Sequence, residues 1–230
     1  DTAGNVASSV YGSSITVDNT AGTISAGYVD TGSNSSDHIT SNGVVTVALT
    51  SDVASWEYST DGGTTWNVGG GNSFTLAAGT YASGDVRVHQ TDLAGKSGSD
   101  VGIGAITVDT TVAAPGIMLH ADTGLLGNDG ITTDQVLNVT LASDMASWRY
   151  SLNGGTSWTT GTGSTITLGA DATYTAGKIV VEQTDTAGNV ASSVYGSSIT
   201  VDTTAPSAPT LLLDQASDTG VFDSDGYTTV

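Results

Sequence analysis

An 18-residue segment, DTAGNVASSVYGSSITVD, occurs twice in this chain without a single difference, at positions 1–18 and 185–202. It belongs to a longer repeat, because Asp18, Asp109 and Asp202 each begin a similar stretch, 91 and then 93 residues apart. Such a period is too long for ankyrin, tetratricopeptide or leucine-rich solenoids. A unit of this size can bury roughly two thirds of its unfolded surface. We therefore expect each repeat to fold as a separate domain.

The repeat boundaries divide the 230 residues into four parts. Residues 18–108 and 109–201 are predicted to be two complete immunoglobulin-like repeats. Residues 1–17 are predicted to be the C-terminal strand of a preceding repeat, and residues 202–230 the N-terminal part of a following one. On this interpretation the chain begins at a cut within a longer protein.

Short stretches of alternating apolar and polar residues indicate the fold class. Val45, Val47 and Leu49 are one example, and turn residues such as Gly, Asp and Asn separate such stretches along the chain. This pattern is typical of an antiparallel sandwich, in which alternate side chains enter the core. We predict an all-β fold with tandem immunoglobulin-like antiparallel β-sandwich domains in a linear array.

Seven strands are expected in each repeat. In the second repeat they include 116–121, 135–142, 147–152 and, as one continuous final strand, 190–201. The Asp-Gly and Asn-Gly pairs in STDGGTTW and SLNGGTSW indicate hairpins, since such turns need positive φ angles.

The four tryptophans fall at corresponding positions of the two repeats. Trp56 and Trp148 precede the hairpin turn, where an immunoglobulin-type sandwich has its core tryptophan, so we expect both in the core. Trp66 and Trp158 follow the turn. They could be exposed for stacking on a sugar, but packing on the sheet is the favoured interpretation.

The charge balance narrows the range of partners. The chain has 23 acidic and only 4 basic residues, a net charge of −19, and all but two of the acids are aspartates. Nucleic acid and anionic lipid are disfavoured because neither would find a positive patch. The sequence contains no run of about 18 apolar residues, the length that would predict a membrane-spanning helix. Cysteine is absent, so a secreted array of such domains would need some other means of rigidification.

The predicted topology brings aspartates together where two repeats meet. Alternate loops of a sandwich lie at alternate ends, so Asp30 and Asp37 of the first repeat should approach Asp109 in the linker and Asp144 and Asp185 in the second repeat. Carboxylates held this close repel one another unless a cation lies between them. Oxygen ligands on flexible loops suit Ca²⁺ better than Mg²⁺. The alternative is that these aspartates only cap turns.

Four motifs carry a resemblance that covers the whole chain: VDTTAP, DTAGN, DTG followed by DGIT, and WxYSxxGG. Together they resemble the bacterial Ig-like tandem repeats of giant Bap-type and RTX-type surface adhesins, which are secreted through type I systems. The resemblance implies a cell-surface array in which calcium ions between domains stiffen a long stalk. The ligands that it implies are Asp18, Asp109 and Asp202 in linkers, Asp30, Asp37, Asp122 and Asp129 in loops, and Asp92 and Asp185 in turns.

Two departures from this pattern affect the first repeat. Its linker reads VDNTAG, with no proline, and His38 stands where the second repeat has Gly130. We therefore expect a less rigid first linker and a less certain loop site.

The sequence shows no arrangement of residues typical of catalysis. His38, His89 and His120 have no histidine counterparts in the other repeat, so surface positions are expected for them and no enzymatic activity. We expect a monomeric, extracellular segment on the bacterial surface whose partners are calcium and the neighbouring repeats. Two other functions stay open: direct binding of a glycan or protein, including self-association, and an accessory role beside a polysaccharide-degrading enzyme.

Overall fold

Alternating apolar side chains build two separate cores in this chain. In the computed structural model, which describes residues 1–211, 221 and 222, this described part contains strands and turns but no helix. The strand around Val45 and Val47 shows the principle, because these side chains are 0% and 4% exposed while their neighbours face solvent. One core lies between Ile24 and Val108, and the other between Leu137 and Val201.

The first repeat contains ten strands in three sheets, ordered β1-β3-β6, β5-β4-β8-β9 and β2-β10-β7. The strands are β1 (Ser25–Tyr28), β2 (Ile39–Thr40), β3 (Val44–Ala48), β4 (Val53–Ser59), β5 (Asn67–Val68), β6 (Ser73–Thr75), β7 (Gly79–Tyr81), β8 (Arg87–Asp92), β9 (Val101–Gly102) and β10 (Ile106–Val108). All pairings are antiparallel except that of β2 with β10, which is parallel.

The second repeat has the same plan, with sheets β11-β13-β16, β15-β14-β18-β19 and β12-β20-β17. Its strands are β11 (Gly116–Leu119), β12 (Ile131–Thr132), β13 (Val136–Thr140), β14 (Met145–Ser151), β15 (Thr159–Thr160), β16 (Thr165–Thr167), β17 (Ala172–Tyr174), β18 (Val180–Asp185), β19 (Val190–Val194) and β20 (Ile199–Val201). Side chains from the facing sheets meet in one core, so each repeat is an immunoglobulin-like β-sandwich.

The final strand differs from the sequence prediction. The expected single strand at 190–201 is divided into β19, which pairs with β18, and β20, which joins the small sheet beside β17. The break falls at residues 195–198, which include Gly196. Parallel to β20 lies β12, formed by the last residues of the DGIT motif. The long loop between the first two predicted strands therefore contains a short strand of its own.

The tryptophans take the predicted places. Trp56 and Trp148 are 4% and 5% exposed, and each ring lies so close to a glycine, Gly69 or Gly161, that a Cβ there would collide with it. Trp66 and Trp158 are half-buried on the outer face of the four-stranded sheet. There the Trp66 ring packs against His89 at a tilt of 43°, and the Arg149 guanidinium covers Trp158.

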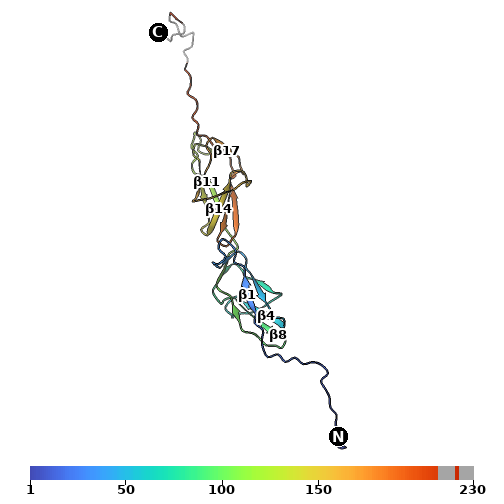
Figure 1. The fold of residues 1–230 in the computed structure, drawn as a ribbon. Coiled ribbons are helices and arrows are strands. Elements are labelled where there is room, and N and C mark those ends of the chain that lie inside the picture. The colour runs from blue at the N-terminus through green and yellow to red at the C-terminus, as the bar shows by residue number, and fades with distance from the viewer. Residues whose placement is uncertain (212–220, 223–230) are drawn as a thin grey trace.

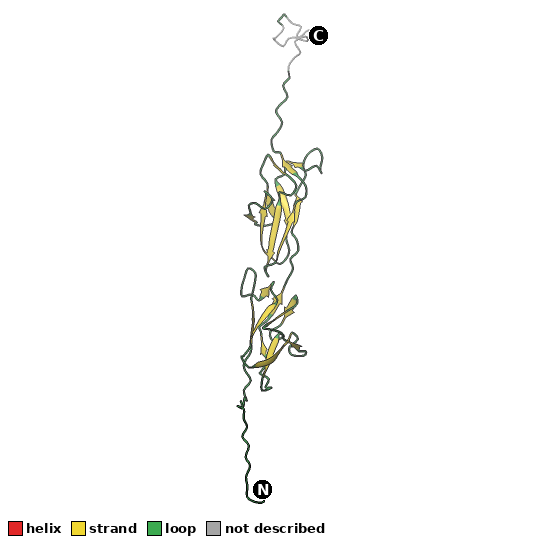
Figure 2. Cartoon of the chain, turned by 90° about the vertical axis from the view of Figure 1, so that its right-hand side faces the viewer, coloured by secondary structure: helices red, strands yellow, loops and turns green. Residues whose placement is uncertain are grey.

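The two repeats lie end to end along the chain, joined by a short linker (Figures 1 and 2). Residues 1–17, predicted to be a final strand, contain no strand in this structure and extend away from the first repeat. The expected further repeat at 202–230 falls largely on residues outside the described part.

The hairpin after β4 allows a test of local electrostatics. Asp61 accepts hydrogen bonds from the Thr65 hydroxyl (2.6 Å), the Thr65 N–H (2.8 Å) and the Ser59 hydroxyl (2.7 Å). These bonds, those from Thr65 first, lower the pKa of Asp61 to about 2. In the second repeat Asn153 makes the matching bonds to Ser151 and Ser157 without a charge.

We predict that NMR titration of the Asp61 carboxyl gives a midpoint near 2, and that Thr65→Ala moves it towards 3.8. Because the folded-state pKa is lowered, the stability that Asp61 contributes is complete above 3.8 and is lost as the pH falls towards 2. The variant Asp61→Asn should keep the turn and remove this contribution to the pH dependence. A midpoint near 3.8 in the unaltered chain would contradict the prediction.

Candidate functional site

The turn after β18 is built around a completely buried aspartate. Asp185 is 0% exposed, its Oδ1 accepts the Asn189 N–H and its Oδ2 accepts the Asn189 side-chain amide, both at 2.8 Å. Asp1 and Asn5 make the same pair of bonds in the duplicated segment, although no sheet surrounds them. The sequence DTAGN therefore encodes this turn locally, through an aspartate that bonds the backbone following it.

Two further carboxylates gather beside Asp185. Asp144 comes from the turn between β13 and β14, and Asp109 from the linker that follows β10. One oxygen from each of the three residues lies within 4.8 Å of the others. The Asn189 side chain also donates to the Asp109 carbonyl at 2.8 Å, and the Thr186 N–H donates to the Asp144 carbonyl at 3.0 Å. The linker is thus held against the end of the second repeat.

A second group of the same design lies at the start of the first repeat. Asp18 from the linker, Asp52 from the turn before β4 and Asp92 at the end of β8 again bring their ligand atoms within 4.8 Å of one another. Hydrogen bonds from Thr20, its backbone N–H first, hold the pKa of Asp18 below its usual value. Asp92 is 1% exposed, and its Oδ2 is buried without a hydrogen-bond donor.

Asp52 was missed by the sequence prediction, which named only its counterpart Asp144. The signal was available, because TSDVASW and ASDMASW place the two aspartates at the same position of the repeat.

The loop aspartates of the first repeat do not join the group at the junction. The sequence predicted that Asp30 and Asp37 would meet Asp109, but their carboxylates turn back to their own loop, where they accept the N–H groups of His38 (2.9 Å) and Ile39 (3.0 Å). His38 has a φ of 63°, close to the 75° of its counterpart Gly130. The histidine therefore adopts the glycine conformation, and the loop keeps its shape.

The second repeat repeats this arrangement. Asp122 accepts the Gly130 N–H and Asp129 accepts the Ile131 N–H, both at 2.9 Å. Asp202 is exposed and accepts the Thr204 N–H at 3.1 Å. Among the described residues these three aspartates belong to no group of three metal-ligating side chains. Asp30 and Asp122 each retain a buried Oδ1 that has no hydrogen-bond partner.

The loop of the first repeat instead contacts the second repeat through its backbone and hydroxyl groups. The Ala187 carbonyl accepts the Thr31 hydroxyl at 2.8 Å and the Ser41 N–H at 3.2 Å. Gly32 and Gly188, both with positive φ, pack backbone against backbone across the junction. Ala187 is 0% exposed, whereas Ala94, its counterpart at the other end of the array, faces solvent.

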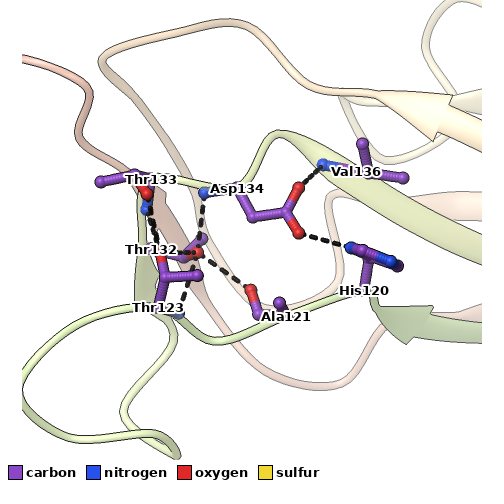
Figure 3. A network of polar contacts seen from close by, with 7 residues as sticks. All are labelled: His120, Ala121, Thr123, Thr132, Thr133, Asp134 and Val136. Carbon is purple, nitrogen blue, oxygen red and sulfur yellow. Dashed lines mark hydrogen bonds and ion pairs between the residues drawn. The ribbon is translucent and has the colours of Figure 1, made fainter.

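The corresponding loop of the second repeat has the same internal bonds. In Figure 3 the Thr123 hydroxyl is hydrogen-bonded to the hydroxyls of both Thr132 and Thr133. The two oxygen–oxygen distances are 2.9 and 2.8 Å. In the first repeat the Thr31 hydroxyl makes the same two contacts, with Thr40 and Ser41. Beside it, the Asp134 carboxylate lies 2.6 Å from His120 Nδ1, and this bond lowers the pKa of Asp134. The loop that docks at the junction is therefore preformed in each repeat.

The carboxylate groups have the chemistry of a hard-cation site. Each pair of charges about 4 Å apart repels by on the order of 4 kcal/mol at an effective dielectric constant of about 20. A buried, unpaired carboxylate oxygen such as Asp92 Oδ2 adds a further cost unless a positive partner approaches it. Carboxylates and backbone carbonyls on turns are the ligands that Ca²⁺ takes in proteins. Both groups fit a divalent cation on this basis.

The similarity of this chain to known proteins is limited to solved structures. No family of known proteins matches the chain, and no curated protein matches it. Among solved structures, the chain is similar to the fibronectin(III)-like modules of Clostridium thermocellum CbhA, with 13% identity and a TM-score of 0.42, over 78% of this chain and 94% of that chain. Within the described residues, no helix is long and apolar enough to span a membrane.

The close backbone contact at Gly32 allows us to predict the effect of adding one methyl group there. Gly32→Ala would place a Cβ against the Thr186 carbonyl, in a backbone conformation of φ 102° that alanine disfavours. We expect both sandwiches to stay folded while their fixed orientation is lost. Residual dipolar couplings should then report different alignment tensors for the two repeats. Gly71→Ala is the matched control, since Gly71 also has positive φ but no neighbour within 4 Å; a shared tensor in both variants would contradict the assignment.

Proposed function

We propose that this chain is an extender segment of a large bacterial cell-surface adhesin, stiffened by calcium where its repeats meet. In this role it is extracellular, monomeric and non-catalytic, and it holds a distal adhesive domain away from the cell. The proposal joins the resemblance of the sequence motifs to surface adhesins with the geometry of the junction.

The observation that carries the proposal is the position of Asp109. This carboxylate belongs to the linker, but its partners Asp144 and Asp185 belong to the repeat that follows. A cation bound by all three would therefore tie the linker to the end of the second repeat. Rotation about the linker would be restricted, because its first residue would be held at the same turn that contacts the preceding repeat.

The rest of the linker supports a rigid connection. The Gln183 side chain donates to the Ala113 carbonyl, and Pro115 limits φ just before β11. The side-chain oxygen Oε1 of Gln183 accepts the Ala142 N–H at 3.0 Å, so a single buried side chain joins the linker to the loop that carries Asp144. Without a cation, repulsion among the three carboxylates opposes this arrangement.

Calcium is the cation that this chemistry favours. The ligand atoms are oxygens on turns and a linker, which can supply the larger and more variable shell that Ca²⁺ accepts and Mg²⁺ does not. Extracellular calcium modules bind with dissociation constants of about 10⁻⁴–10⁻³ M. At a calcium concentration about 100-fold above such a constant, binding stabilises the folded state by about 2.7 kcal/mol for each site.

Direct glycan binding, the alternative function, would need an accessible aromatic surface on the repeats. The residues nearest to that description are Trp66 and Trp158, and these rings are half-buried beneath His89 and Arg149. The partial burial of both rings therefore makes glycan binding the less favoured function, and the geometry of the junction supports the mechanical role.

A distance measurement tests the mechanical role directly. The chain has no cysteine, so Ser83→Cys with Ala176→Cys provides two unique labelling sites at matching exposed positions of the two repeats. We expect a narrow distribution of spin-label distances in millimolar Ca²⁺ and a broad one in EDTA, with Mg²⁺ less effective than Ca²⁺.

The variant Asp109→Asn should require at least about tenfold more calcium to narrow this distribution, because it removes one of three charges from the site. Asp100→Asn, which changes a carboxylate outside both groups, should behave as the unaltered chain does. An unchanged distribution on calcium removal would count against the proposal.

A further inference from the structure

The two acidic groups differ at one residue of the turn that carries the buried aspartate. Each buried aspartate is followed four positions later by the residue that closes its turn, which is Asn189 in the second repeat and Lys96 in the first. Both donate a backbone N–H to the aspartate Oδ1 at 2.8 Å. Only Asn189 has a side chain that also donates to Oδ2, in that case of Asp185, and to the linker carbonyl of Asp109.

The exchange of Asn for Lys leaves an oxygen free in the first group. Asp92 Oδ2 is buried and has no donor, on a side chain that is only 1% exposed and lies within 4.8 Å of its acidic neighbours Asp18 and Asp52. An unpaired carboxylate oxygen at such a depth costs free energy, and a cation shared with Asp18 and Asp52 would remove that cost. The group therefore differs from a cluster of surface acids, because Asp92 Oδ2 is buried and has no hydrogen-bond donor, so it is available to a cation.

Lys96 places a positive charge beside this group. It is one of four basic residues in the chain, and of the others Arg87 and Arg149 pair with Asp100 and Glu182 on the sheets. Lys96 lies in the turn itself, where its backbone N–H donates to Asp92 Oδ1 at 2.8 Å. The side chain is exposed and flexible, so its ammonium can approach the carboxylates or withdraw from them.

We propose that Lys96 is a built-in competitor for the divalent cation at the first group, so that Asp18, Asp52 and Asp92 bind calcium more weakly than Asp109, Asp144 and Asp185. This inference rests on the proposed calcium function and adds a graded response to it. A unit charge several ångströms from a doubly charged ion weakens binding by about tenfold in a well-solvated site. The second group, beside Asn189, fills at lower calcium, and the first group, beside Lys96, fills at higher calcium.

Reciprocal substitutions test this inference in the full chain. Lys96→Asn should tighten calcium binding at the first group by about tenfold, and Asn189→Lys should weaken it at the second group by about tenfold. Backbone amide signals of Gly95 and Gly188, one in each turn, report the two sites separately in an NMR titration with CaCl₂. Both substituted side chains are at or near the surface, and the turn keeps its backbone hydrogen bonds.

Two further variants separate the charge of Lys96 from the missing amide. Lys96→Met removes the charge without supplying an amide, so it should also tighten binding, whereas Lys96→Arg should leave binding weak. If Lys96→Met has no effect, or if the unaltered sites bind equally, the inference is wrong while the calcium function stands. If neither glycine signal responds to calcium at millimolar concentrations, the proposed calcium function itself fails, and the inference with it.

Discussion

Each repeat buries one carboxylate, at the end of β8 or β18, and this charge governs how the repeat meets its linker. Asp92 and Asp185 are 1% and 0% exposed, and a charge taken so far from water must be compensated by hydrogen bonds or by a cation. The DTAGN turn supplies part of that compensation, since Asn189 donates to both oxygens of Asp185. The locally encoded turn thus supplies hydrogen bonds that the buried carboxylate needs.

The same turn performs two tasks at opposite sides of the junction. Towards the linker, Asp185 meets Asp109 and Asp144. Towards the preceding repeat, the Ala187 carbonyl accepts bonds from Thr31 and Ser41. Because both contacts use one short segment, whatever orders the acidic group also orders the surface on which the preceding repeat docks. This coupling is the reason that we propose a junction whose stiffness depends on a cation.

Repeats that are nearly alike in fold need not have junctions that are alike in chemistry. The two sandwiches share their strand order and the positions of three aspartates, yet Lys96 and Asn189 give the two acidic groups different charges and different hydrogen bonds. If the two groups bind calcium as proposed, their affinities can differ without a change in the domains themselves.

Much of the fold could be predicted from the sequence because it depends on short-range pattern. The period of the repeat, the sandwich class and the core positions of Trp56 and Trp148 follow from alternation and turn residues. The meeting of Asp109, Asp144 and Asp185 followed from the alternation of loop ends. The inward turn of Asp30 could not be predicted in this way, since a loop aspartate can bond its own backbone or a neighbour with similar energy.

The duplicated 18-residue segment shows which features are local to the sequence and which need the rest of the fold. Its first five residues form the same aspartate turn in both copies, because the bonds lie within the segment. The remainder forms β19 and β20 in one copy and no strand in the other, where Ile15 is 69% exposed although its counterpart Ile199 is 0% exposed. A strand needs hydrogen-bonding partners and a core that lie far away in the sequence, so identical residues fold differently where those partners differ.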